Sequence, residues 1–256
     1  MPGEYKMETF DYIVQYPDAA VAPFVESYWM VKNHSAAPKE IVLLPDGRVD
    51  LILSCAPNEP FEIRLMGLST GPDSTSIQPG TLLFAISFRL LAGEYLFGSS
   101  LASLLNSSSR MPELFWNFLP KDLNDFPLFC IKAGHAIQRQ MPDTIDNRKE
   151  ALFQLLYSTN GNICVQELAD QTYWSSRQIN RYFRDHYGLP LKAYSNILRF
   201  RASFPHIKAG RLFPEQDFAD QPHFIKEIKK LSGARPKDLF KNENDRFIQF
   251  STLHKI

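Results

Sequence analysis

The chain has 256 residues, 44% of them hydrophobic, and 28 basic side chains balance 28 acidic ones, so its formal net charge is zero. This length is typical of about two domains with sizeable cores, which excludes disorder over most of the chain. The zero is a cancellation, because residues 1–144 hold 10 basic and 16 acidic side chains (net −6) and residues 145–256 hold 18 and 12 (net +6). Chance drift produces such an asymmetry, and so does a basic nucleic-acid or membrane module joined to an acidic domain.

The N-terminus and the apolar runs argue against export and membrane insertion. The first residues include acidic side chains where a signal peptide has basic and then apolar ones. The longest apolar run, residues 81–88, is far shorter than the roughly 20 residues that span a bilayer. Cys55, Cys130 and Cys164 are widely spaced and form no CxxC pair, which predicts no disulfide framework and no zinc site. We therefore expect a cytoplasmic protein without a membrane partner, metal or cofactor.

Short apolar runs separated by turn residues predict strands in the first half of the chain. Pro45, Asp46 and Gly47 stand between two of these runs and predict a hairpin. In the following run, apolar residues alternate with Arg48, Asp50 and Ile52, so that one face points to the core and the other begins in water. This pattern favours an antiparallel, half-buried sheet or barrel. The predicted strands are residues 25–31, 41–44, 49–53, 61–66 and 82–88.

The remainder of the first half predicts a few helices. Pro112 and the apolar residues after it indicate a short helix over 112–118, with proline in its first turn. Residues 131–140 form a second candidate helix. Residues 98–110 are rich in serine but carry leucines at helical spacing, which favours an ordered loop over a linker.

Nothing in this half predicts catalysis. His34 and His135 are isolated, and neither an HExxH nor a GxSxG motif occurs. Asp46 and Asp50 are explained as a turn residue and an edge-strand charge. If this half binds a small molecule, we expect an apolar, aromatic pocket inside the sheet; the alternative for the same aromatic residues is a simple core position. The candidate ligand-binding residues are Tyr28, Trp29 and Phe84.

The second half predicts helices, two of which form a helix-turn-helix. A helix over 148–159 ends at Asn160 and Gly161. A short amphipathic helix starting at Val165, a turn over 172–174 and a second helix capped by Ser175 or Ser176 follow. The second helix of such a unit enters the major groove of DNA, where arginine pairs with guanine and asparagine with adenine. A solvated basic face is the alternative explanation. The candidate DNA-binding residues are Ser175, Ser176, Arg177, Gln178, Asn180, Arg181 and Arg184.

A second, similar unit follows a linking helix over 189–200. Residues 182–194 and 227–240 share a layout in which a basic helix end is followed by glycine and then by proline. The pairs are Gly188 with Pro190 and Gly233 with Pro236. The repeated layout predicts two copies of one supersecondary unit.

These motifs resemble the AraC/XylS-type transcriptional regulators. The resemblance is carried by ELA at 167–169, SSRQINRYF at 175–183, GLPLKAY at 188–194, FADQPHF at 218–224 and GARP at 233–236, and LPDG at 44–47 is similar to the sensory domain of one subgroup. It implies a bacterial transcription factor whose DNA-binding domain has seven helices with two helix-turn-helix units. The base-facing positions that it implies are Arg177, Asn180 and Arg181 in the first unit and Gln221, Pro222, Ile225 and Lys226 in the second.

The sequence departs from the family pattern mainly in the second unit. Pro205 predicts that the linking helix stops near 204 or kinks, because proline disrupts a helix interior. Pro214 falls in the first helix of the second unit, and Asp217 replaces the usual turn glycine. Tyr173 replaces the turn glycine of the first unit. We expect the first unit to carry most of the sequence reading.

Together these observations predict an α+β protein with an N-terminal, mostly antiparallel sheet or barrel and an all-α C-terminal domain. The expected divisions are an effector-binding or dimerisation domain over 1–144, a DNA-binding domain over 145–245 and a tail over 246–256. The expected function is sequence-specific regulation of transcription, with double-stranded DNA as partner, a small-molecule effector and a homodimer as further partners, and no enzymatic activity. The alternative is an eroded regulator that binds other proteins and not specific DNA.

Overall fold

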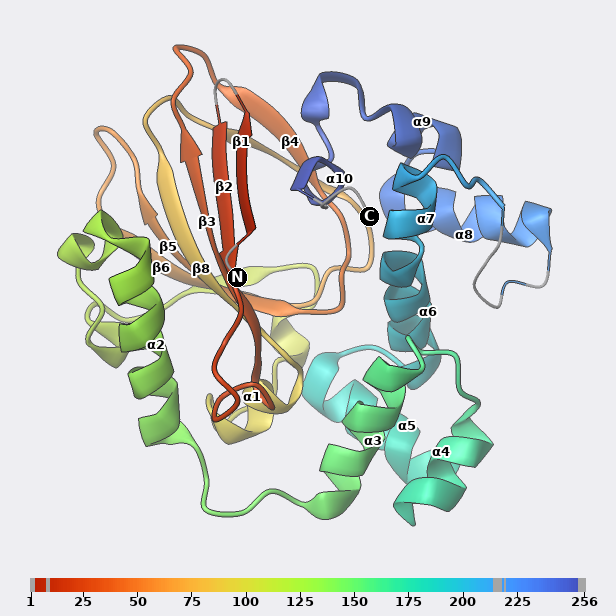
Figure 1. The fold of residues 1–256 in the computed structure, drawn as a ribbon. Coiled ribbons are helices and arrows are strands. Elements are labelled where there is room, and N and C mark those ends of the chain that lie inside the picture. Colours follow the sequence, from red (N-terminus) through yellow and green to blue (C-terminus); the bar gives the residue numbers. More distant parts are fainter. Residues whose placement is uncertain (1–2, 8–9, 214–217, 219, 253–256) are drawn as a thin grey trace.

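The computed structural model describes residues 3–7, 10–213, 218 and 220–252. Figure 1 shows a sheet part and a helical part lying side by side, with α6 joining a lower group of helices to an upper one. The expected α+β fold, with an antiparallel sheet followed by helices, is confirmed. Within these residues no helix is both long and apolar enough to cross a membrane.

The strands form two antiparallel sheets, and all five predicted strands are present. Every strand pair in both sheets is antiparallel. The seven-stranded sheet has the order β1 (Gly3–Met7), β2 (Phe10–Gln15), β3 (Val25–Asn33), β8 (Leu82–Phe88), β5 (Val49–Cys55), β6 (Glu62–Met66) and β9 (Ser108–Arg110). The two-stranded sheet pairs β4 (Lys39–Leu43) with β7 (Asp73–Ile77).

The hairpin predicted at residues 45–47 is wrong. β4 pairs with β7, whereas β5 pairs with β6 and β8, so this turn carries the chain from one sheet to the other. Gly47 has a φ of 79°, and a Cβ there would lie 3.2 Å from the side chains of Tyr194 and Leu198. The Tyr194 hydroxyl also donates to the Gly47 carbonyl oxygen over 3.0 Å. The turn is therefore packed against the helical part, a contact that local turn chemistry does not predict.

One face of the large sheet packs on α2 (Phe126–Gln140). The Phe84 ring lies 5.1 Å from Phe126 and 5.2 Å from Phe129, centroid to centroid. α2 begins five residues before the predicted start, because the Asp125 side chain accepts a hydrogen bond from the Leu128 amide and caps the helix. The inward positions of β5 are buried, as predicted.

The segment between β8 and α2 contains short turns. It comprises α1 (Leu91–Tyr95), η1 (Ala102–Leu104), β9, η2 (Phe115–Asn117) and η3 (Pro120–Asn124). The α-helix predicted over 112–118 is wrong, because Leu114, Trp116 and Asn117 have positive φ angles. The Trp116 ring stacks on Phe97 at 5.5 Å, and this packing holds the backbone in turns. The ordered loop predicted over 98–110 is confirmed: Leu101 is buried, and η1 packs against α5.

The helical part begins after the connection that contains residue 144. Its helices are α3 (Asn147–Ser158), α4 (Val165–Thr172), α5 (Ser176–Tyr187), α6 (Leu191–Ala202), α7 (Phe204–Lys208), α8 (Gln221–Ser232), α9 (Pro236–Lys241), η4 (Glu243–Asp245) and α10 (Ile248–Thr252). The break predicted at Pro205 is confirmed, since α6 ends at Ala202 and α7 has Pro205 in its first turn. Pro214 and Asp217 lie outside the described residues.

Buried tyrosines and the chain end join the two parts. The Leu90 amide donates to the Tyr157 hydroxyl oxygen, and the Tyr187 hydroxyl donates to the Leu90 carbonyl oxygen, each over 3.1 Å. The Tyr182 hydroxyl donates to the Glu94 carboxylate, also over 3.1 Å. Residues 246–252, expected as a tail, return to the sheet part, where the Val42 amide donates to the Arg246 carbonyl oxygen over 2.6 Å. One hydrophobic cluster extends through both parts.

Candidate functional site

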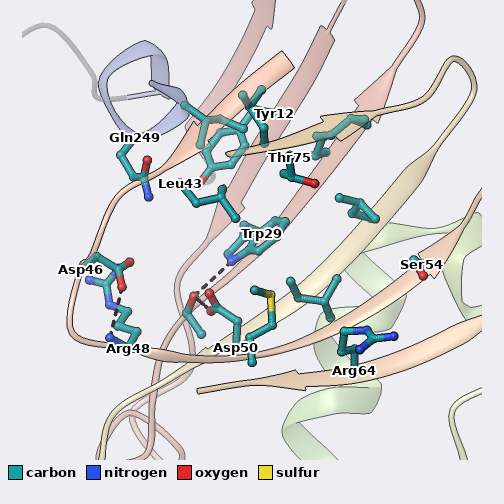
Figure 2. A pocket seen from close by; sticks show the side chains of 18 of the residues that line it. Tyr12, Trp29, Leu43, Asp46, Arg48, Asp50, Ser54, Arg64, Thr75 and Gln249 are labelled. Carbon is teal, nitrogen blue, oxygen red and sulfur yellow. Dashed lines mark hydrogen bonds and ion pairs between the residues drawn. The ribbon is translucent and has the colours of Figure 1, made fainter. Parts of the chain in front are cut away.

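A cavity of about 680 Å³ lies between the two sheets, on the face of the large sheet that is turned away from α2. Alternate residues of β2, β3, β8, β5 and β6 form its wall on one side, and β4 and β7 close the other. Figure 2 shows Asp50 and Trp29 close together, with Asp46 and Arg48 on one side of them and Arg64 on the other.

The strand register fixes which residues share this wall. Ser27 of β3 and Asp50 of β5 both pair with Ser87 of β8, so these three side chains form one row across the sheet. Trp29 and Ile52 lie in the next row, on either side of Ala85. Because side chains alternate between faces, every second residue of each strand points into the cavity.

Asp50 contributes a half-buried carboxyl group to this wall. It accepts a short hydrogen bond from the Ser87 hydroxyl, and the Ser87 oxygen accepts one from the Trp29 indole N–H over 3.1 Å. Burial raises the pKa of Asp50 to about 7, and the nearby charge of Asp46 adds to this shift. The folded protein therefore holds a proton on this carboxyl group more strongly than a carboxyl group in water does.

A β-bulge at Glu26 collects three arginines at one end of the cavity. The register between β3 and β8 shifts between Val25 and Ser27, which re-aims the intervening Glu26. The Glu26 carboxylate binds the guanidinium of Arg48 at 2.5 Å, that of Arg201 at 2.9 Å and that of Arg89 at 3.6 Å. Arg48 also lies 3.5 Å from Asp46. Burial raises the pKa of Asp46, while the Arg48 charge opposes this shift.

The helical part supplies one wall of the cavity. Arg201 of α6, Phe204 of α7, and Ile248 and Gln249 of α10 line it, and the Gln249 amide donates to the Leu44 carbonyl oxygen over 3.0 Å. Since Arg201 binds Glu26 of the sheet part, the cavity wall and the contact between the two parts share the same ion pair.

The structure separates the three predicted ligand-binding residues. Trp29 lines the cavity, but Tyr28 and Phe84 lie on the opposite face of the sheet, 3% and 2% exposed, and belong to the core next to α2. Of the three candidates Trp29 therefore lines this cavity, while Tyr28 and Phe84 take the core positions expected as the alternative, because neighbouring residues of a strand point to opposite faces.

The explanation of Asp50 as an edge-strand charge is also wrong. β5 lies between β6 and β8 in the interior of the sheet, and the face that bears Asp50 turns to the cavity. In the sequence, the alternation of polar and apolar residues in β5 indicates that one face of this strand is polar. No sequence pattern indicates the bulge at Glu26 or the contribution of the distant Arg201 to the cavity.

α4 and α5 form the predicted helix pair, with a turn between them. Tyr173 ends α4 in the left-handed conformation (φ 54°) and is 89% exposed, at the position where the related pattern has glycine. Ser175 caps α5: its hydroxyl oxygen accepts from the Gln178 amide, and the Gln178 side-chain oxygen accepts from the Ser175 amide over 2.9 Å. Ile179 and Phe183 are fully buried, which fixes the face that α5 turns outward.

The candidate DNA-binding residues of α5 differ in how free their side chains are. Arg177, Arg181 and Arg184 are exposed and follow one another along the outer face of the helix. The Gln178 side chain belongs to the cap, and the Asn180 amide donates to the Ser176 carbonyl oxygen over 3.0 Å. Three guanidinium groups are therefore the main polar feature that α5 presents to solvent.

The candidate residues of α8 are likewise exposed but less polar. Gln221, Pro222, Ile225 and Lys226 all lie on its outer face. Asp220 caps the helix by accepting from the His223 amide over 2.8 Å. Residues 209–220 separate α7 from α8, and part of this segment is outside the described residues. The tight turn predicted for the second unit is thus not among the features described.

Within residues 3–7, 10–213, 218 and 220–252, no group of three or more His, Cys, Asp or Glu side chains could hold a metal ion.

Comparisons with known proteins give a family match for the sheet part and similar solved structures for most of the chain. Residues 14–110 match a family model described as a domain of unknown function (DUF6597). No curated protein matches the chain. The structure of ToxT from Vibrio cholerae is 13% identical, with 91% of this chain and 98% of that chain covered and a TM-score of 0.43. ToxT bound to an unsaturated fatty acid is 12% identical, with 94% of each chain covered and a TM-score of 0.42. Identities this low do not transfer a function from ToxT to this chain.

Proposed function

We propose that this protein is a sequence-specific DNA-binding regulator of transcription, of the AraC type, in which α5 reads the major groove. The observation that carries the proposal is the capped α4–turn–α5 pair with Arg177, Arg181 and Arg184 on its exposed face. α5 carries three exposed arginines against one exposed acidic residue, Asp185 near its end, so its outer face is net positive and attracts phosphates. Arginine side chains in the groove bind guanine through two hydrogen bonds.

α8 makes the smaller contribution in this proposal. Gln221 is able to pair with adenine and Lys226 with guanine or phosphate, whereas Pro222 and Ile225 offer apolar contact to a thymine methyl group. We propose the cavity as the site of a small-molecule effector, because the helical part forms one of its walls through Arg201 and α10. Dimerisation stays a prediction.

Selection from a random DNA pool tests the proposal. The purified full chain is expected to enrich one sequence motif, and a variant with Arg177→Ala and Arg181→Ala is expected to lose it. Arg139→Ala, an exposed arginine on α2, is the matched control and is expected to keep it. With about 6 phosphate contacts, affinity should fall roughly a thousandfold between about 50 and 200 mM salt.

Failure of the wild-type chain to enrich any motif would contradict the proposal. It would favour the alternative, a protein that binds other proteins through its helical surface. Salt-insensitive capture of duplexes would have the same meaning, because contacts to phosphates release counterions.

A further inference from the structure

We propose that the cavity binds a small organic cation with a flat aromatic body, its charged group beside Asp50 and its ring against Trp29. The inference rests on the proposed role of the cavity as effector site and names the class of effector.

The charged side chains of the cavity wall have an excess of acid. Its carboxyl groups are those of Glu26, Asp46, Asp50, Glu59, Glu62 and Asp73, and its guanidinium groups are those of Arg48, Arg64 and Arg201. With every group ionised, six negative charges against three positive ones leave a net charge of −3. A low-dielectric space lined in this way attracts a positive ligand and repels a negative one.

The three guanidinium groups are already paired, and Arg89 and Arg110 from outside the wall also pair with Glu26 and Glu62. Among the described residues, the wall acids without an ion pair are therefore Asp50, Glu59 and Asp73. Arg48 and Arg201 bind Glu26, and Arg64 binds Glu62 at 2.7 Å. Asp50 accepts a hydrogen bond from Ser87, and among the described residues no ion pair with Asp50 is found. An anionic ligand would share the arginines with these carboxylates and find only the Arg48 Nε–H without a hydrogen-bond partner among the buried guanidinium donors of the described wall, whereas a cation meets a carboxyl group at Asp50 that is in no ion pair there.

Aromatic and apolar residues beside Asp50 provide the place for a ring. The Trp29 and Tyr12 rings stack with centroids 6.5 Å apart and an angle of 23° between their planes, and both line the cavity. Ile52 and Met66 face the same space. The face of an indole ring attracts both aromatic groups and cations. In Figure 2, Trp29 lies next to the Asp50 carboxyl, so one ligand can contact both.

The protonation state of Asp50 supports the same ligand class. Burial raises the pKa of Asp50 to about 7, so the empty site resists the second charge next to Asp46. A bound cation compensates that cost and favours the ionised form. A neutral ligand of the same shape gains nothing from this charge.

Three indole compounds that differ in one group test the proposal by titration calorimetry of the full chain at about pH 8: tryptamine (cationic), indole-3-ethanol (neutral) and indole-3-acetate (anionic). Tryptamine is expected to bind at least about tenfold more tightly than the alcohol, and the acetate more weakly than both. Equal or tighter binding of the acetate would overturn the proposal, and so would an absence of tryptamine binding.

Two variants with the same chemical change locate the effect. Asp50→Asn is expected to weaken tryptamine about tenfold and leave indole-3-ethanol unchanged, while Asp143→Asn, an exposed carboxylate outside the cavity wall, changes neither by more than about twofold. Equal tryptamine binding by wild type and Asp50→Asn would overturn the assignment. Enrichment of a DNA motif without tryptamine binding refutes this inference alone; tryptamine binding without DNA selection refutes only the regulator function.

Discussion

The sheet part and the helical part use charged residues in opposite ways. In the sheet part, Glu26 and Arg48 are largely buried and are held by ion pairs. On α5 the arginines are exposed, and their placement follows from the buried positions between them. A buried charge needs a partner in the folded protein, because its loss of hydration is costly. An exposed charge has no such need and is available to an external partner.

This difference separates residues whose replacement changes folding from residues whose replacement changes only binding. Residues of the first group are recognised by their ion pairs. Residues of the second group are recognised because they are exposed and recur at helical spacing on one face. The following predictions test the distinction.

The largest effect is expected for Glu26→Gln. Glu26 compensates Arg48, Arg201 and Arg89, and its loss leaves Arg201 and Arg89 without this carboxylate, while Arg48 keeps only the more distant Asp46. Removing one partner of a fully buried pair costs about 3–5 kcal/mol, and because these side chains are 13–34% exposed we expect about 2–3 kcal/mol. Urea unfolding at neutral pH measures the loss, with Glu59→Gln as the control at an exposed wall position. A change of less than about 0.5 kcal/mol would show that the network is not structural.

Arg181→Ala is expected to weaken DNA binding and leave the folding stability nearly unchanged. Its stability should stay within about 0.5 kcal/mol of the wild type, because the side chain is exposed. Its affinity for the selected duplex should fall by about 1–3 kcal/mol, the amount that one arginine–guanine pair contributes. Fluorescence anisotropy with a labelled duplex measures this, and Arg139→Ala is the control. A loss of stability as large as that of Glu26→Gln would break the distinction between the two parts.

The sequence predicted the features that depend on local patterns. Strands and helices were predicted because side-chain alternation and helical periodicity are local. The outer face of α5 follows from the spacing of Ile179, Tyr182 and Phe183. Pro205 was a reliable signal, since a proline interrupts a helix by its own covalent structure.

The cavity was predicted poorly because its determinants are not local. Gly47, which follows β4, packs against α6, and the pairing of Glu26 with Arg201 joins residues 175 positions apart. Trp29 was identified as a candidate, but Tyr28 was included with it, since aromatic content alone does not say which face of a strand lines a pocket. Asp50 was interpreted as an edge-strand charge because the pairing of β4 with β7, which forms the second sheet, does not follow from the sequence of β5.

Asp50→Asn should change stability in a pH-dependent manner. The folded-state pKa of about 7 lies above the ordinary value of 3.8, so the folded protein retains a proton that the unfolded chain has released. The stabilisation from Asp50 is complete below about pH 4 and is lost as pH rises to 7 and beyond. Asparagine does not ionise, so the variant should be more stable than wild type by roughly 2 kcal/mol at about pH 8 and by much less at about pH 4.

The groups that face Asp50 are Asp46 and Arg48 from the connection to β5, Glu26 and Trp29 from β3, and Ser87 from β8. Thermal unfolding of both proteins across this pH range measures the difference, and Asp73→Asn is the control. A stability gain that is the same at every pH would assign the effect to packing and not to the charge of Asp50.

The smallest effect on DNA affinity is expected for Gln221→Ala. This variant, set beside Arg181→Ala, compares α8 with α5. Gln221 is exposed like Arg181 but is uncharged, and its neighbours Pro222 and Ile225 offer no hydrogen bonds to bases. We expect a loss of specific affinity of about 0.5 kcal/mol, or roughly two- to threefold, in the same anisotropy assay. Lys226→Ala is the companion variant. If the Lys226 side chain contacts a phosphate, the variant should reduce the slope of log affinity against log salt concentration by about 1 and keep the preferred motif. A loss for Gln221→Ala equal to that for Arg181→Ala would mean that both helices read DNA equally, since exposure alone would then determine the contribution of each residue.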